Sequence, residues 1–362
     1  METQEFIFNK TNFHLSSGSY TWKAPSNIAL VKYWGKTDPQ IPKNTSLSFT
    51  LNNCFTETQL VFTPIENKSN PNNFDFEVFL DKKPEDHFKP KIQLFFEKII
   101  QYTPFLHQFK FQIFTHNSFP HSSGIASSAS GFAALALCIM SIEKEIDPKM
   151  TDDYFFKKAA FLARLGSGSA TRSIRGNLIL WGKHNEFESS SDLFGSIYSK
   201  PIHHMFKDYQ DTVLLVDKGQ KKVSSSVGHN LMNNHPYAKQ RFIQAQHSIS
   251  KISNAIAIGD LESFITIVES EALTLHAMMM TAHPYFILMH PNTLRIINKI
   301  WEYRKAMKSN VCFTLDAGAN VHVLYPKRET DTVISFIDNE LKQFCQNNQY
   351  ICDHVGEGAI LI

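Results

Sequence analysis

Small residues dominate one stretch of the chain. A stretch of this kind lets the backbone approach a neighbouring sheet or a ligand closely. Residues 120–130 read Pro-His-Ser-Ser-Gly-Ile-Ala-Ser-Ser-Ala-Ser, and Gly-Phe-Ala-Ala-Leu-Ala follows. The pattern predicts a helix over Ile125–Ile142 that can pack closely against a sheet. Its start is also a candidate phosphate site, because free N–H groups and the positive end of the helix dipole favour phosphate oxygens. Both interpretations stay open on these residues alone, and a Walker A loop is excluded because no Gly-Lys-Ser/Thr follows the glycine.

Length and composition narrow the class of protein. A chain of 362 residues is long enough for two domains, or for one large domain with insertions. With 19% charged and 12% aromatic residues it has a globular composition, and a formal net charge of +2 gives no basic surplus for nucleic-acid binding. The longest apolar stretch, Gly131–Ile142, is too short to cross a bilayer. Five scattered cysteines without a C-x-x-C pair predict reduced thiols, and we expect a soluble, cytoplasmic protein.

Hydrophobic periodicity predicts an α+β fold with two layers. Predicted helices cover Lys91–Tyr102, Asp152–Leu165, Pro236–Ile258, Leu261–Met280, Thr293–Met307 and Asp331–Gln346. Predicted strands cover Tyr20–Lys23, Ile28–Tyr33, Leu47–Leu51, Phe109–Thr115, Asn177–Trp181, Thr212–Val216, Val311–Leu315 and Val321–Tyr325. A polar stretch between Thr63 and Pro90 predicts a hairpin with a surface loop. The composition changes near residues 199–207, which we take as the candidate domain boundary.

Three further segments carry residues suited to anion chemistry. Asn27–Lys36 places two lysines around Tyr-Trp-Gly, which can meet a polyanion or simply form a solvated strand edge. Arg164–Ser173 combines Gly-Ser-Gly-Ser with Arg172, whose planar fork suits a carboxylate or phosphate, although such a segment also ends helices. Phe313–Asn320 holds a lone Asp316 after an apolar run, either as a carboxylate in a cleft or in a turn.

No set of side chains has the spacing of metal ligands. His203 and His204 are adjacent, His276 and His283 are separated by a predicted helix end, and other histidines lack cysteine or carboxylate partners at ligand spacing. No Gly-x-Ser-x-Gly elbow or Cys/His nucleophile signature occurs either. We therefore expect no metal site formed by side chains.

Taken together and in order, these segments resemble the diphosphomevalonate decarboxylase family of the GHMP superfamily. The carriers of the resemblance are NIALVKYWGK (27–36), NTSLSFTL (44–51), residues 120–134, GSGSATRS (166–173), KKVSSSVG (221–228), LHAMMMTAHPYF (275–286) and DAGAN (316–320). The resemblance implies a ribosomal protein S5 domain 2-like N-terminal domain over residues 1–205, and a GHMP C-terminal α+β domain over 206–362. It places the active site in the cleft between them.

The same resemblance implies Mg²⁺-dependent use of ATP to convert mevalonate 5-diphosphate to isopentenyl diphosphate, with release of ADP, phosphate and CO₂. Asp316 is implied as the carboxylate beside the C3 hydroxyl, acting as base or as an orienting charge. Lys32 matches the lysine near the reacting phosphoryl group, and Arg172 the arginine that binds the substrate carboxylate. The implied substrate-binding residues are Tyr33, Trp34, Gly35, Lys36, Ser167, Gly168, Ser169, Ala170, Thr171, Arg172, Ser225 and Ser226. The implied ATP-phosphate loop contains Pro120, Gly124, Ala126, Ser127 and Ser128, where the two serines can contact phosphate or help to hold Mg²⁺.

Several positions depart from the family pattern without removing a catalytic group. Ala319 replaces a proline, His121 and Ser122 make the phosphate loop more polar, and His229 replaces a methionine. A hydroxyl at Ser226, where many members carry arginine, leaves less positive charge for a diphosphate.

Three alternative functions therefore stay open. A decarboxylase acting on the monophosphate and a mevalonate 3-kinase belong to the same superfamily, and a non-catalytic nucleotide-binding protein is a different class. The resemblance also implies a homodimer that binds a small-molecule substrate, with neither nucleic acid nor a membrane as partner.

Overall fold

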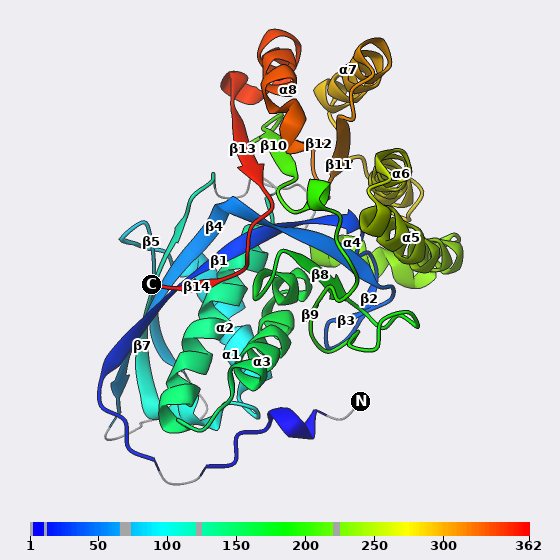
Figure 1. The fold of residues 1–362 in the computed structure, drawn as a ribbon. Helices are drawn as coiled ribbons and strands as arrows, with labels where there is room; N and C mark the ends of the chain where they lie inside the picture. The colour runs from blue at the N-terminus through cyan, green and yellow to red at the C-terminus, as the bar shows by residue number, and fades with distance from the viewer. Residues whose placement is uncertain (1–2, 11–12, 66–73, 121–124, 220–224) are drawn as a thin grey trace.

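A computed structural model describes residues 3–10, 13–65, 74–120, 125–219 and 225–362. Within these residues, one sheet of eight strands and one of four form the framework, with helices packed against each (Figure 1). The α+β class predicted from the sequence is confirmed.

The large sheet is built on two long antiparallel strands, β1 (Gly18–Val31) and β4 (Ser46–Pro64). Its order is β14-β1-β4-β7-β5-β6, and β8 joins β4 and carries β9. The remaining bounds are β5 Asp75–Leu80, β6 Lys83–Pro84, β7 Phe109–Asn117, β8 Leu178–Trp181, β9 Ser196–Ile197 and β14 Ile360–Leu361. The predicted hairpin forms between β5 and β6. A separate small ribbon pairs β2 (Lys36–Thr37) with β3 (Ile41–Pro42).

Strand β4 is much longer than the sequence pattern predicted. Its second half contains buried threonines. Their polar side chains interrupt the apolar pattern of the sequence, but in the fold their hydroxyls contact other hydroxyls. The Thr56 hydroxyl lies 2.6 Å from that of Ser130, and the Thr58 hydroxyl 3.1 Å from that of Thr115. Likewise, the two short strands predicted at Tyr20–Lys23 and Ile28–Tyr33 are one strand, interrupted only by bulges near Pro25 and Leu30.

Helices α1 (Lys89–Ile99), α2 (Ser127–Ile146) and α3 (Asp152–Gly166) cover one face of the large sheet (Figure 1). The predicted small-residue helix is α2, which is buried along most of its length between the sheet and α3. Its Ser141 hydroxyl accepts a hydrogen bond from the Trp22 indole at 2.8 Å. Tight packing against a sheet is therefore confirmed for this helix.

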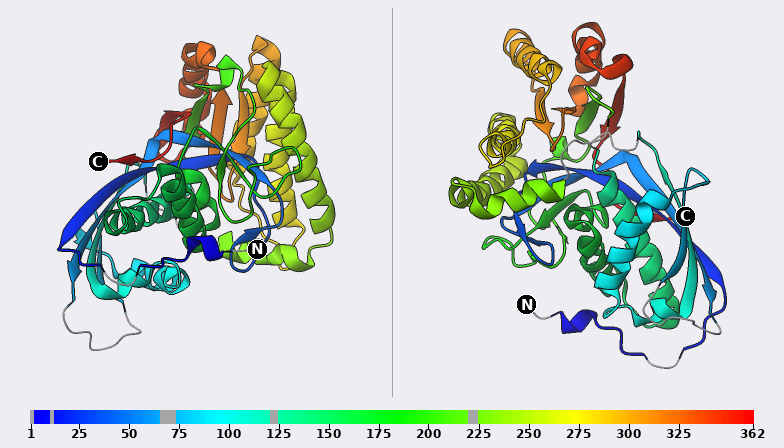
Figure 2. Two further views of the ribbon diagram at one scale, coloured as in Figure 1. Left: turned by 60° about the horizontal axis from the view of Figure 1, so that its bottom comes forward. Right: turned by 180° about the vertical axis from the view of Figure 1, so that it is seen from behind.

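The small sheet has the order β11-β12-β10-β13. Its strands are β10 Gln210–Leu214, β11 Cys312–Leu315, β12 Val321–Tyr325 and β13 Tyr350–His354. Figure 2 shows later helices beside this sheet, namely α5 (Ala238–Ile258), α6 (Leu261–Met280), α7 (Pro291–Met307) and α8 (Thr330–Phe336). The short helix α4 (Ser225–Leu231) lies beyond the end of β1, where its His229 packs against Tyr33 and Trp34. The helix predicted over Asp331–Gln346 is wrong in its extent: α8 ends at Phe336, and a π-helical turn (Ile337–Leu341) followed by short 3₁₀ turns leads to β13.

The last described residues return to the large sheet. In β14, Leu361 pairs with Trp22 and Ile360 with Lys23, so the chain ends on the edge of β1. The isolated bridges Leu51 to Val355 and Arg175 to Gly358 tie the preceding segment to the same part of the fold. The division of the chain at residues 205 and 206 stays a prediction.

Candidate active site

Two charged side chains meet where the two sheets adjoin. Lys32 follows the end of β1, and Asp316 follows the end of β11, 284 positions later in the chain. The Lys32 Nζ lies 3.3 Å from the Asp316 Oδ1, with 2% of the lysine side chain exposed and 29% of the aspartate. Burial lowers the pKa of Lys32, and the negative charge of Asp316 opposes that shift. The pair is a buried cation with one partly accessible carboxylate.

Arg172 adds a second buried cation. It lies in a 3₁₀ turn (Gly168–Ser173) just after α3. Its Nε donates to the Asn27 Oδ1 at 3.2 Å, and its Nη1 to the Ser46 hydroxyl at 2.6 Å. Burial lowers the pKa of Arg172 to about 10, whereas the charge of Asp316 acts in the opposite direction. The guanidinium also lies over the Tyr33 and Trp181 rings, about 6 Å from each centroid.

Aromatic rings form a wall beside these charges. His229 lies against Tyr33 and Trp34, with ring centroids 4.2 and 4.7 Å away. The Gly35 N–H donates to His229 Nδ1 at 2.9 Å, so a neutral ring carries its proton on Nε2. Burial, with Lys36 and Arg172 nearby, lowers the pKa of His229 to about 3. The ring of His229 is therefore uncharged at neutral pH. The buried Tyr33 hydroxyl has no hydrogen-bond partner among the residues that the structure describes.

Close packing explains the glycine at position 168. A Cβ there would lie 2.8 Å from the Tyr33 hydroxyl and 2.9 Å from the Trp181 ring. The neighbouring Ser167 hydroxyl is 3.5 Å from that of Ser128, so the Gly-Ser-Gly-Ser turn meets the start of α2. The Ser169 carbonyl accepts from Asn27 at 3.2 Å. The turn thus links two of the segments that the sequence singled out.

Other residues of the predicted substrate set have structural contacts. Ala170 is buried, and the Thr171 hydroxyl accepts a hydrogen bond from the Gly195 N–H. Lys36 donates to the Gln40 side chain at 2.8 Å, and burial lowers the pKa of its amine. Trp34 packs into an apolar cluster with Met232, Leu275, Met278 and Met279.

The predicted phosphate loop is described only in part. Ala126 caps α2 in a left-handed conformation with φ of 40°, Ser127 is half-buried and Ser128 is exposed, as is Pro120. His121, Ser122 and Gly124 lie outside the described residues. The backbone of Ser225 and Ser226 opens α4, but their side chains are not described. The start of α2 therefore exposes hydroxyls and the positive end of a helix dipole beside Ser167.

Sequence reasoning missed three residues that contact the main chain of the Lys32–Asp316 pair. Glu271 accepts from the Lys32 N–H, Arg241 donates to the Lys32 carbonyl, and His276 donates to the Asp316 carbonyl. The Leu275–Phe286 segment was noted for its resemblance, but no local pattern distinguishes a histidine that holds a carbonyl from one buried in a core.

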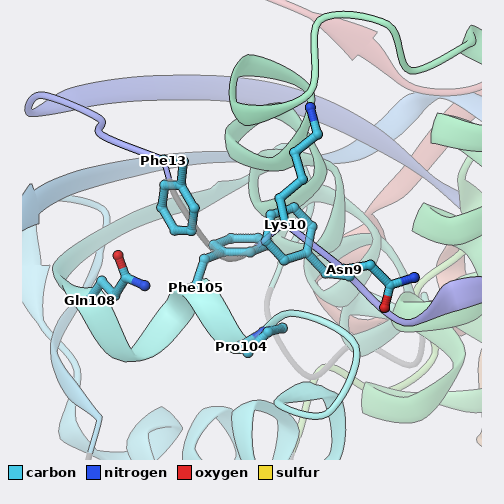
Figure 3. A pocket seen from close by; sticks show the side chains of 7 residues that line it. Asn9, Lys10, Phe13, Pro104, Phe105 and Gln108 are labelled. Atoms are coloured by element: carbon cyan, nitrogen blue, oxygen red, sulfur yellow. The ribbon is translucent and has the colours of Figure 1, made fainter.

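Figure 3 shows a pocket of about 400 Å³ elsewhere in the molecule, formed where the N-terminal segment lies against residues 104–108. It is lined by Phe8, Asn9, Lys10, Phe13, Pro104, Phe105 and Gln108. It contains none of the residues that converge around Asp316. This pocket is therefore separate from the candidate site.

The described part of the chain holds no group of three or more histidine, cysteine or acidic side chains placed to bind a metal ion. None of its helices combines the length and apolar character needed to span a bilayer. All five cysteines are free thiols, and Cys352 is the exposed one.

Comparison with known proteins identifies the class to which this fold and site belong. Residues 24–192 match the model of the diphosphomevalonate decarboxylase-like N-terminal domain, and residues 212–358 match that of the mevalonate 5-diphosphate decarboxylase C-terminal domain. The fold is thus that of the GHMP-type two-domain proteins. The chain belongs to the diphosphomevalonate decarboxylase family.

Individual relatives agree with this placement. The chain is 29% identical to a diphosphomevalonate decarboxylase of Ganoderma lucidum, over 88% of this chain and 80% of that protein. It is similar in structure to the mevalonate diphosphate decarboxylase of Staphylococcus aureus, with a TM-score of 0.80, 27% identity and coverage of 96% and 98% of the two chains. The structure of MDDEF with MVAPP, AMPPCP and magnesium matches with a TM-score of 0.79, 27% identity and coverage of 96% and 99%.

Proposed function

We propose that this chain catalyses the ATP-dependent decarboxylation of mevalonate 5-diphosphate, yielding isopentenyl diphosphate, ADP, phosphate and CO₂. The observation that carries the proposal is the convergence of Lys32, Arg172 and Asp316 in a chain of this family. A buried amine lies 3.3 Å from a carboxylate, and a buried guanidinium stands close enough for its charge to act on that carboxylate. Such a set can bind an anionic substrate and handle a hydroxyl proton at the same place.

The chemistry assigns each side chain a task. The C3 hydroxyl is a poor leaving group, so its oxygen attacks the γ-phosphorus of ATP and ADP departs, while Asp316 orients the hydroxyl or takes its proton. Lys32 neutralises charge on the transferred phosphoryl group. Loss of that phosphate leaves positive charge at C3, and the electrons of the breaking C–CO₂⁻ bond form the alkene. Arg172 binds the carboxylate and orients it for departure.

The described residues also fit ATP and Mg²⁺. The start of α2, with Ser127 and Ser128, suits the phosphate groups, since a helix N-terminus provides N–H donors. Mg²⁺ commonly uses phosphate oxygens and water with one or two protein oxygens, so the hydroxyl of Ser127 or Ser128 could complete such a site. The metal supplies neutralising charge for the phosphates, and this chain supplies the serine hydroxyls.

Assembly, location and domain division form part of the same proposal. We expect a cytoplasmic homodimer with a domain division at residues 205 and 206. Free thiols throughout the chain support a reducing compartment. Light scattering on the purified protein measures the assembly, and a mass of one chain, near 41.4 kDa, contradicts the homodimer.

Product analysis tests the proposed reaction. The purified protein is incubated with Mg-ATP and, separately, with mevalonate, its 5-phosphate and its 5-diphosphate, while ADP, phosphate and CO₂ are measured. CO₂ and phosphate released together from the diphosphate support the proposal. CO₂ from the monophosphate alone identifies the other decarboxylase, ADP without CO₂ a 3-kinase, and no product a nucleotide-binding protein.

The Asp316→Asn variant tests the assignment of the carboxylate. Asparagine has nearly the same shape but neither charge nor basicity, so we expect CO₂ release to fall by at least about 1,000-fold while ATP binding persists. Nucleotide binding by calorimetry is the control that the fold is intact. Near-normal turnover by this variant contradicts the role of Asp316.

A further inference from the structure

Helix α6 contacts the main chain on both sides of the Lys32–Asp316 pair. Glu271 Oε2 accepts a hydrogen bond from the Lys32 N–H at 3.0 Å, and His276 Nε2 donates to the Asp316 carbonyl at 3.1 Å. Lys32 leaves the large sheet and Asp316 leaves the small sheet. One helix therefore connects the two strand ends that bring the charged side chains together.

A buried ion pair with Arg241 holds the Glu271 carboxylate that contacts Lys32. Arg241, on α5, donates to both carboxylate oxygens of Glu271, and the two side chains are 1% and 0% exposed. Arg241 Nη2 also donates to the Lys32 carbonyl at 3.3 Å, which Asn44 contacts as well at 2.9 Å. Both polar groups of the Lys32 main chain are thus fixed by groups that solvent does not reach.

The contact to Asp316 comes from a neutral histidine. His276 is 1% exposed, and burial lowers its pKa to about 4, so the ring is uncharged at neutral pH. Because a carbonyl can only accept, the ring proton is on Nε2. The same Asp316 carbonyl accepts from the Gly318 N–H at 2.7 Å, which closes a tight turn. His276 therefore fixes the peptide from which the carboxylate projects.

We propose that Glu271 and His276 are positioning residues, through which α6 sets the geometry of Lys32 and Asp316 for the reaction. The inference rests on the proposed function for its effect on turnover. Neither residue needs to touch substrate, since each acts through a main-chain group of a residue that does. A displacement of about 1 Å at a reacting group costs on the order of 100-fold in rate, so loss of one of these bonds affects kcat more than binding.

Two substitutions at His276 separate hydrogen bonding from packing. His276→Leu removes the donor, whereas His276→Gln keeps an N–H near the position of Nε2. His235→Leu is the matched control, because buried His235 donates to the Met278 carbonyl on the same helix at 3.1 Å and makes no contact with Asp316. We expect kcat to fall about 100-fold in His276→Leu with KM for ATP within about threefold. We expect it to fall less than tenfold in His276→Gln, and to stay near the wild type in His235→Leu.

Two kinetic outcomes would contradict the proposal. Equal kcat in His276→Leu and His235→Leu overturns the proposal, as does equal loss in His276→Leu and His276→Gln. If the leucine variant does not fold, His276→Asn replaces it, because the shorter amide places its N–H farther from the carbonyl than glutamine does.

Hydrogen exchange tests the positioning without using the reaction. Exchange of the Gly318 amide, followed by mass spectrometry on peptides covering residues 315–321, is expected to speed up at least tenfold in His276→Leu and not in His276→Gln. Unchanged exchange overturns the proposal even if the enzyme is active. A wild-type protein that releases no CO₂ contradicts the proposed function, while the exchange result still decides whether His276 holds this turn.

Discussion

At the scale of single residues, Arg172 is restrained more than a surface arginine. Two of its nitrogens already donate to Asn27 and Ser46, and the Tyr33 and Trp181 rings flank the guanidinium. These contacts aim the fork before any ligand binds. Because folding already orients the guanidinium, little conformational entropy is lost when a planar carboxylate binds to it.

Arg172→Lys should therefore be a severe change although it keeps the charge. A lysine has one compact ammonium group and cannot reach Asn27, Ser46 and a ligand together, so we expect kcat/KM for CO₂ release to fall at least about 100-fold. The matched control is Arg175→Lys, since Arg175 forms an exposed pair with Asp153 and should tolerate the change. Steady-state kinetics with both variants checks this, and similar losses in the two contradict it.

The buried lysine predicts a pH dependence. Because burial lowers the pKa of Lys32, the amine of the free enzyme loses its proton at a lower pH than an ordinary lysine, whose pKa is 10.5. In the proposed reaction the protonated form of Lys32 is the active one, so kcat/KM should decline on the alkaline side with a midpoint below 10.5. Profiles of kcat/KM between pH 7 and 10.5 measure this for the wild type and for Lys36→Arg, because burial also lowers the pKa of Lys36. A profile that stays flat to pH 10.5, or a decline that Lys36→Arg abolishes, contradicts the assignment.

At the scale of elements, helices α2 and α3 share a buried ion pair. Lys158 Nζ lies 2.6 Å from Glu143 Oε1, with side-chain exposures of 0% and 3%, and also donates to the Tyr102 carbonyl at 3.0 Å. Removing one partner leaves an uncompensated buried charge. Replacing both by apolar residues avoids that cost.

Lys158→Met should accordingly lower the free energy of unfolding by about 3–5 kcal/mol, and adding Glu143→Leu should restore much of the loss. Urea unfolding of the single and double variants measures the two effects. Lys157→Met is the neighbouring control, because its pair with Glu5 is exposed and contributes about 1 kcal/mol or less. A double variant less stable than Lys158→Met contradicts this account.

The sequence predicted the long helices better than the strands. Helices such as α5 and α6 have sustained apolar periodicity, and their predicted bounds differ from the structure by two residues or fewer. The missed strands include β13 and β14, which are short and contain exposed or charged residues, and pairing with a distant strand decides their form. Residues after Phe336 keep an apolar pattern, but the change to π-helical and 3₁₀ turns depends on tertiary packing.

The sequence predicted some residues of the candidate site and missed others. Lys32, Arg172 and Asp316, which the resemblance implied as catalytic residues, come from compact motifs, and the structure brings the Lys32 and Asp316 side chains to within 3.3 Å. Residues that act through the main chain have no such motif. Arg241 and Glu271 are 30 positions apart on two helices, and only the packing of those helices brings them to Lys32.

At the scale of the whole molecule, the last described residues pair with β1, the first strand of the large sheet. The N–H of Ile362 donates to the Thr21 carbonyl at 2.9 Å, and that of Ala359 donates to the Ile174 carbonyl at 3.0 Å. Strand β14 thereby covers an edge of β1 that would otherwise present unpaired N–H and C=O groups. Exposed edges of this kind pair with other chains.

Deletion of residues 359–362 should therefore lower stability and promote self-association. At about 0.5–1.5 kcal/mol for each lost hydrogen bond, the expected loss is on the order of 1–3 kcal/mol. Leu361→Ser is the control, since this side chain is 52% exposed and the main-chain pairing is kept. Thermal unfolding and light scattering report the two effects, and a deletion variant that matches Leu361→Ser in both contradicts the role of the edge strand.

The position of β14 also affects the order of events during synthesis. Trp22 leaves the ribosome more than 300 residues before its partner Leu361, an interval of tens of seconds at about 5–20 residues per second. Throughout that time β1 can pair with β4 but not with its other neighbour. The nascent chain therefore carries an open edge of β1 until residues 360–361 have been synthesised.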